Sequence, residues 1–388
     1  LDSIRQYPVT ATRPVTEKSL GSVSRSFFDP KRRELITAVR YPGEFAHIAA
    51  IDVDTGKSRK IVDIATPALY FVSSLAYDDS SGTVFYTTNN ARGWRDLNRV
   101  DVDTGESERL VRWARTGDLA FNRTDKSLWG IMHHNGLVHI VRIPPPYDAV
   151  YVVMPLDYRQ DFYDMDVSPD GRFLTGTLVD VGGRSKLIRV NIDGLLLGGA
   201  EIEELHQFGD HSPLNFVYSP DGRYLYGTSY LTGASNIFRY DNETGAMEAV
   251  SNAETGYFRP IPAGPDSVIA YEYTGDGMKP VIMADATLED IAPLKWLGVA
   301  IGQKHPEVDD WVLGSPLSVD PDSVIVYQGD YNAFRSMRMN SIYPVIEGYK
   351  HWTAVGLRAD FSDPTGIHSA HLAASYTGQK NVPSDENF

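Results

Sequence analysis

A short pattern of two apolar runs separated by a tight polar turn recurs six times along this chain of 388 residues. In two copies the turn reads Ser-Pro-Asp-Gly, at residues 168–171 and 219–222. The equivalent turn positions are spaced 44 to 51 residues apart, and they are Asp29, Asp78, Asn122, Ser168, Ser219 and Ala263. A period of this length is typical of a β-propeller, in which each repeat is one four-stranded blade.

The chemistry of the turns supports the repeat. In Ser-Pro-Asp-Gly, Pro presets φ, Asp caps the turn and Gly tolerates a left-handed backbone, so the turn connects two antiparallel strands at little cost. A second turn ending in Thr-Gly starts at Asp52, Asp101 and Asp241, each time after an alternating strand. These turns resemble calcium loops superficially, but they lack the further acidic ligands. Each repeat therefore reads as four strands with two marked hairpins.

We predict an all-β protein with a six-bladed β-propeller and a C-terminal β-hairpin extension. Residues 1–21 are a lead-in segment, residues 22–285 the propeller, and residues 286–342 a linker or a propeller-closing segment. Seven blades remain an alternative, because residues 317–328 could form a further hairpin or a closing strand. In the fourth blade, residues 191–204 exceed the length of a turn and have room for a helical turn.

Composition excludes several classes of function. The chain has no Cys, which excludes disulfides, thiolate nucleophiles and Cys-ligated metals. Its formal net charge of −15 disfavours nucleic-acid binding, which depends on basic groups that neutralise phosphates. No apolar run approaches the roughly 18 residues of a membrane helix. We therefore expect neither a nucleic-acid partner nor a helical membrane anchor.

The C-terminal end has a different pattern. Residues 349–360 and 367–376 alternate between apolar and polar side chains, and Asp363-Pro364-Thr365-Gly366 lies between them. Two strands of about ten residues have the length needed to cross an outer membrane, whereas an isolated hairpin is marginally stable. We expect residues 343–388 to begin an outer-membrane β-barrel. Because the chain begins at Leu1, we also expect a processed or excised piece of a longer protein.

Two sets of residues resemble known families. The Ser-Pro-Asp-Gly-Arg-(Phe/Tyr)-Leu copies at 168–174 and 219–225 resemble the WD40-like repeats of TolB-type bacterial propellers. Residues 343–350 and 363–368 resemble the entry into a surface-antigen outer-membrane barrel. Proteins that join two such parts are cell-envelope proteins of Gram-negative bacteria, some with a metallopeptidase-like domain upstream. The resemblance implies a periplasmic or outer-membrane location.

Motifs that would indicate catalysis are missing from the sequence. It contains no Gly-x-Ser-x-Gly elbow, no phosphate-binding glycine loop and no His-Glu-x-x-His, so no peptidase activity can be assigned to any residue. The most ligand-like pair is His133-His134, but neighbours on a strand point to opposite faces. We predict no catalytic residue, no metal ligand and no cofactor.

A ring of polar residues is the first candidate binding site. The position four residues before each turn anchor is polar in all six repeats, and these residues are Arg25, Ser74, Asp118, Asp164, Asn215 and Arg259. In a propeller they would converge at the mouth of the central channel, where a small ligand or a partner's side chain binds. The alternative is that they hydrogen-bond only to channel water.

The loops on the same face supply a second set of candidates. These residues are Trp94, Arg95, Asp96, His133, His134 and Asp180. Trp and Arg are the residue types that most often anchor interfaces.

The favoured hypothesis is a noncatalytic cell-envelope module that binds a protein or peptide partner at its channel face. The alternative is a channel hydrolase or lyase with a divalent cation held by Asp118, Asp164 and Asn215. Arg25 and Arg259 oppose a cation in that ring. Two Asp and two Arg have no net charge, so we expect a zwitterionic or polar guest.

Overall fold

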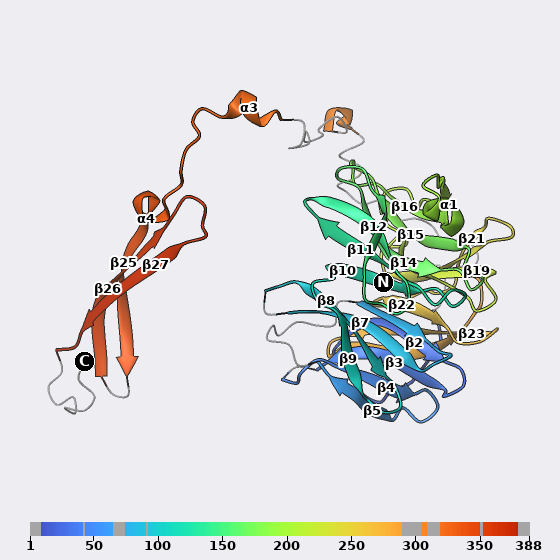
Figure 1. Cartoon of the computed structure of the whole chain (residues 1–388). Helices are drawn as coiled ribbons and strands as arrows, with labels where there is room; N and C mark the ends of the chain where they lie inside the picture. Colours follow the sequence, from blue (N-terminus) through green and yellow to red (C-terminus); the bar gives the residue numbers. More distant parts are fainter. Residues whose placement is uncertain are drawn as a thin grey trace. The chain divides into compact units, whose positions relative to one another are not determined.

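The structure is a computed structural model that describes residues 9–41, 43–64, 74–90, 92–288, 304–308, 319–349 and 352–378. It confirms the predicted all-β class. The chain divides into two compact units, residues 1–313 and residues 314–388 (Figure 1). Among the described residues, no helix has both the length and the apolar character that crossing a membrane requires.

The described part of the first unit contains six four-stranded antiparallel sheets (blue to yellow in Figure 1). From the innermost strand outward, the first three sheets are β2–β5 (Ser22–Asp29, Glu34–Arg40, His47–Asp52, Ser58–Asp63), β6–β9 (Ser74–Asp78, Thr83–Asn89, Arg95–Asp101, Ser107–Val111) and β10–β13 (Thr116–Phe121, Leu128–His134, Leu137–Ile143, Tyr151–Pro155). The others are β14–β17 (Asp161–Val167, Phe173–Val179, Ser185–Asn191, Ile202–His206), β18–β21 (Leu214–Tyr218, Tyr224–Ser229, Asn236–Asp241, Met247–Ala249) and β22–β24 with β1 (Tyr257–Pro262, Ser267–Thr274, Gly277–Ala284, Thr12–Pro14).

The six sheets stand in a closed ring. Their innermost strands contact one another in the order β2, β6, β10, β14, β18, β22 and back to β2. The core is correspondingly split into apolar layers between consecutive sheets; Trp129 and Phe162, for example, lie in the layer between the third and fourth sheets. Each sheet therefore buries both faces against its neighbours, which is the propeller arrangement that the repeat predicts.

The N-terminal segment closes the ring. Strand β1 pairs with β24 as the outermost strand of the sixth sheet, and the backbone N–H of Val15 and Leu20 donate to the carbonyls of Pro280 and Met278 at 2.8 and 2.7 Å. Residues 12–14, which the prediction placed in an N-terminal lead-in segment, are therefore part of the sixth sheet. A segment that precedes the first blade can complete the last blade because the two are neighbours in a ring.

Residues 317–328, which could have formed a further hairpin or a closing strand, contain no strand at the positions that the structure describes. Residues 321–324 form the short helix α3 (Pro321–Val324), capped by Asp320; residues 317 and 318 lie outside the described residues. The described residues between 304 and 337 contain two further short helices, η1 (Pro306–Val308) and α4 (Ala333–Ser336). The predicted helical turn in the fourth blade is confirmed as α1 (Ile192–Leu196).

In each of the turns that end in Thr-Gly, the first Asp side chain accepts hydrogen bonds from the backbone of the turn. The Asp52 carboxylate accepts the backbone N–H of Asp54 at 3.0 Å and of Thr55 at 2.7 Å, and Asp101 and Asp241 repeat this arrangement. Backbone hydrogen bonds from Thr55 and Thr104 hold the pKa of Asp52 and Asp101 below the usual carboxylate range. These carboxylates cap their own turns.

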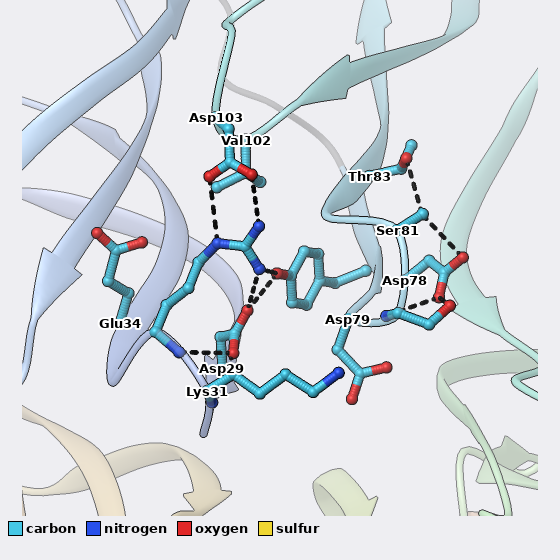
Figure 2. A network of polar contacts seen from close by, with 12 residues as sticks. Asp29, Lys31, Glu34, Asp78, Asp79, Ser81, Thr83, Val102 and Asp103 are labelled. Atoms are coloured by element: carbon cyan, nitrogen blue, oxygen red, sulfur yellow. Dashed lines mark hydrogen bonds and ion pairs between the residues drawn. The ribbon is translucent and has the colours of Figure 1, made fainter.

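A buried carboxylate joins the first two sheets on the face of these turns. Asp29 accepts the Tyr77 hydroxyl of the second sheet at 2.6 Å and the Arg32 guanidinium at 2.8 Å, and Arg32 continues to Asp103 at 2.6 Å (Figure 2). Burial raises the pKa of Asp29, but the hydrogen bonds from Tyr77 and Arg32 outweigh it, so the pKa lies below its usual value.

Replacing Tyr77 by Phe should destabilise the fold by about 1–3 kcal/mol near neutral pH, because a buried carboxylate loses one donor. A lowered carboxylate pKa stabilises the folded state above the unfolded pKa of about 4, and this stability is lost as pH falls through the folded pKa. The difference between Tyr77→Phe and wild type should therefore shrink in acid. Urea unfolding at neutral and acidic pH tests this, with exposed Tyr151→Phe as the control. An equal loss at both pH values would contradict it.

The second unit has three strands where a hairpin was predicted. β25 (Arg338–Tyr349), β26 (Trp352–Ser362) and β27 (Ser369–Tyr376) form one antiparallel sheet. The first predicted strand, residues 349–360, corresponds to β26 but began three residues too early, and the prediction missed β25. The predicted Pro/Gly turn is present after β26, where Asp363 accepts the Tyr331 hydroxyl at 2.6 Å.

The register of this sheet gives it two different faces. Cross-strand rows of one face join apolar residues, such as Ile346, Val355 and Tyr376, and all three of these side chains are exposed. The opposite face has polar contacts, including an Arg358–Asp360 ion pair at 2.9 Å. The sheet is therefore amphipathic, with its apolar face uncovered by the described residues.

Candidate functional site

The innermost strands share a local irregularity that shapes the centre of the ring. In five of the six described inner strands the register advances three residues while the neighbouring strand advances two, which is a β-bulge. The first bulge residue has a positive φ in four of them: Asp118 (46°), Asp164 (56°), Asn215 (54°) and Arg259 (50°). A left-handed backbone at non-glycine residues is uncommon, and bulges with it re-aim side chains.

These bulges surround a cavity of about 220 Å³. All six residues of the predicted ring line it, and they are Arg25, Ser74, Asp118, Asp164, Asn215 and Arg259. The count of four residues back from each turn anchor therefore found residues that share one cavity. That they bind a ligand stays a prediction.

Side chains of the ring also connect successive sheets. The Ser74 hydroxyl accepts the backbone N–H of Leu119 at 2.6 Å, and one Asp164 carboxylate oxygen accepts that of Asn215 at 2.7 Å. Asp118 accepts the N–H of Asp164 at a longer 3.4 Å. Each acceptor thus holds the bulge of the next sheet, so these residues have a structural role besides any binding role.

Arg25 crosses the channel. It starts on β2 of the first sheet and forms an ion pair with Asp166 of the fourth sheet at 2.5 Å, and it also donates to the Leu119 carbonyl at 3.2 Å. The other Asp166 oxygen accepts the backbone N–H of Tyr218 at 2.9 Å. The prediction placed Arg25 at the channel mouth but missed its partner Asp166. The ring was selected by comparing one equivalent position in every repeat, and Asp166 lies at a different position of its repeat.

Arg25 lines two cavities. The second one, of about 110 Å³, is lined by Arg25 and Asp166 together with turn residues such as Pro169 and Pro220. The candidate guest site is the first cavity, because all six residues of the predicted ring line it. Its remaining charges are those of Asp118, Asp164 and Arg259.

Two carboxylates in one cavity influence each other. Burial raises the pKa of Asp118 and the Asp164 carboxylate raises it further, against the hydrogen bond from Asp164 N–H and the positive charges of Arg25 and Arg95. The proton affinity of Asp118 is therefore higher than that of an ordinary carboxyl.

Replacing Asp118 by Asn should stabilise the fold near neutral pH, since Asn keeps an acceptor for Asp164 N–H and removes the buried charge. A raised carboxylate pKa means that the folded state binds the proton more tightly, so wild type recovers stability as pH falls toward the unfolded pKa of about 4. The advantage of Asp118→Asn should vanish there. Thermal unfolding from pH 7 to pH 4 measures it, and a constant advantage would contradict the assignment.

The predicted loop residues differ in their exposure and in their contacts. Asp96 is buried and accepts the N–H of Trp113 at 2.7 Å, and Asp180 accepts backbone N–H groups within its own loop at 2.8 and 2.9 Å. Both therefore support their loops. Asp96 is too buried to face a partner, whereas a binding role of Asp180 stays a prediction. Arg95 lies against Gly117, next to the cavity residue Asp118.

The remaining three loop candidates lie at the surface. Trp94 lies under the guanidinium of Arg115, 3.6 Å from the ring centroid, and Arg115 donates to His134 Nδ1 at 2.7 Å. His133 is exposed on the same hairpin. The sequence analysis did not select Arg112, Trp113 and Arg115. The run Arg-Trp-Ala-Arg in the link between two blades could have indicated them, because Trp and Arg often anchor interfaces.

Among the described residues there is no group of three or more His, Cys, Asp or Glu side chains that could hold a metal ion. No family model matches the chain, and no curated protein matches it either.

Solved structures with some similarity include TolB-like proteins. TolB from Acinetobacter baumannii aligns with 15% identity and a TM-score of 0.46 over 69% of this chain and 64% of that one, so the chain spans less than two thirds of that protein. A putative TolB from Agrobacterium tumefaciens aligns with 13% identity and a TM-score of 0.47 over 92% and 91%. An oligogalacturonate lyase in complex with manganese aligns with 11% identity and a TM-score of 0.49 over 73% and 98%. Such low values transfer no activity, ligand or partner to this chain.

Proposed function

We propose that the chain carries a six-bladed, noncatalytic propeller that binds a protein or peptide partner at its channel face in a Gram-negative cell envelope. The observation that carries the proposal is the convergence of ring residues from all six sheets on one cavity. The closed contact order of the six inner strands supports the blade number.

The chemistry of the cavity favours a small polar guest. Its volume of about 220 Å³ is below the usual range for a drug-sized ligand and suits a chain terminus or one side chain. Asp118 and Asp164 offer carboxylate oxygens, and Arg259 offers donors across the same cavity. A peptide end with its flanking backbone groups can satisfy both kinds of partner.

The alternative function is a channel enzyme with a divalent cation. The neighbouring carboxylates of Asp118 and Asp164 favour it, since hard cations take oxygen ligands. Arg25 and Arg259 line the same cavity, and their positive charges disfavour a bare cation.

The test selects peptides with free termini from a random synthetic library on the full chain and measures the best binder by calorimetry. Asp118→Asn with Asp164→Asn should weaken binding about tenfold or more, because hydrogen bonds to charged groups are lost. Asn is preferable to Ala here, since Ala would leave the N–H groups of Asp164 and Asn215 without acceptors. Exposed Asp276→Asn is the control.

Equal affinity in all variants would refute the cavity as the peptide site. Titration with Ca²⁺ and Mn²⁺ separates the alternatives: cation binding that disappears in the double Asn variant would favour the enzyme.

We also propose that the second unit associates with the outer membrane as the beginning of a surface-antigen-like barrel. Its support is the amphipathic sheet, with exposed Ile346, Val355 and Leu357 on one face. Strands β25 and β26 have 12 and 11 residues, which suits membrane-crossing strands of about ten residues.

The full chain should therefore float with neutral phosphatidylcholine vesicles. Leu357→Lys should reduce the floated fraction, because charges on a lipid-facing strand cost about 2–4 kcal/mol at the bilayer midplane. His371→Lys on the opposite face should not. Equal flotation of the two variants would contradict a lipid-facing role.

A further inference from the structure

Arginine and tryptophan side chains of the β7–β8 loop in the second sheet meet those of the link between the second and third sheets. Trp113 has two guanidinium groups near its ring, that of Arg112 at 4.7 Å and that of Arg92 at 5.6 Å from the centroid. Beside them, Arg115 lies 3.6 Å above Trp94. We call these five residues the Arg/Trp surface; Trp94 and Trp113 are 39% and 44% exposed.

The backbone of this surface is strained and firmly held. Trp113 and Arg115 have φ values of 60° and 54°, a left-handed conformation that bulky residues rarely adopt. The Asp96 carboxylate accepts the N–H of Trp113 at 2.7 Å, and the Arg95 carbonyl accepts that of Arg115 at 3.0 Å. Backbone strain fixed in this way is characteristic of binding sites.

Positive charge is concentrated here, although the whole chain has a net charge of −15. In the described part of the chain no carboxylate forms an ion pair with Arg92 or Arg112, and the nearby Asp96 is buried beneath the loops. Two like charges within 6 Å of one ring centroid repel each other. An anion that contacts both guanidinium groups would offset this repulsion.

The way the rings are covered restricts the ligand. Guanidinium groups already lie over both indoles, so the covered ring faces are not free for a sugar or a base to stack on. What the surface offers is the N–H donors of arginines held by cation–π contacts. A guanidinium fork suits carboxylates and phosphates, and a phosphate monoester brings nearly two negative charges and three acceptor oxygens to one point.

We propose that the Arg/Trp surface binds a phosphoryl group, with Arg92 and Arg112 as its principal donors. A phosphoryl dianion fits two guanidinium groups that share one ring better than the separated single charges of an acidic peptide do. Arg115 is a weaker contributor, because one of its nitrogens donates to His134. This site lies outside the channel cavity, so it does not depend on the peptide-binding role of that cavity.

The test is calorimetric titration of the full chain with inorganic phosphate and with pyrophosphate at low salt. The variant Arg92→Gln with Arg112→Gln should bind about tenfold more weakly or worse, because charged hydrogen bonds are lost. The control Arg40→Gln with Arg184→Gln removes the same two charges from exposed arginines elsewhere on the propeller and should keep wild-type affinity. Circular dichroism checks that both variants fold.

Flotation distinguishes free from lipid-bound phosphate. Extra binding to phosphatidylcholine vesicles that contain phosphatidic acid, lost in Arg92→Gln/Arg112→Gln alone, would identify a lipid headgroup; loss of pyrophosphate binding alone would identify a soluble phosphate compound. Either result supports the proposal. It is overturned if wild type binds neither probe, if the control variant loses as much affinity, or if a glutamate octapeptide binds through Arg92 and Arg112 while the phosphate probes do not.

Discussion

The pairing of β1 with β24 is the contact on which the rest of the first unit depends. It joins the start of the chain to a strand more than 260 residues later and gives the sixth sheet its outer strand. Without it that sheet would expose an edge, and nothing covalent would hold the sixth sheet against the first. The apolar layer between these two sheets, which includes Leu20 and Tyr271, depends on the same closure. A cavity at the centre exists only because the inner strands are held on all sides.

In each of the five sheets with a described bulge, a small residue lies opposite it. Gly130, Gly176 and Gly227 lie on the second strand directly opposite the bulges of the third, fourth and fifth sheets. A Cβ atom at Gly176 would come within 2.6 Å of Phe162, and one at Gly227 within 2.2 Å of Phe216. Ala occupies the same place in the first and sixth sheets, as Ala38 and Ala270. This pattern was readable in the sequence, and it would have predicted the bulges.

The sequence predicted local features well because they repeat at a fixed spacing. The four-residue offset that selected Asp118 and Asp164 worked because the bulge begins four residues before the turn anchor in the third, fourth, fifth and sixth sheets. Contacts between different repeats could not be predicted from this spacing. The reach of Arg25 to Asp166, the contribution of Thr12–Pro14 to the last sheet and the strained backbone of Trp113 each depend on how distant segments meet, and no periodicity records that.

The Arg25–Asp166 bridge also bears on how this ring could change in evolution. The first and fourth sheets face each other only in a ring of six, so a seventh repeat would move Asp166 off the diameter and widen the axis that Arg25 spans. Repeat proteins ordinarily tolerate the addition or loss of units, because each unit contacts only its neighbours. Here one side chain contacts a unit three places away. The bridge therefore depends on the number of repeats, and a duplicated blade would separate two partly buried charges that now pair with each other.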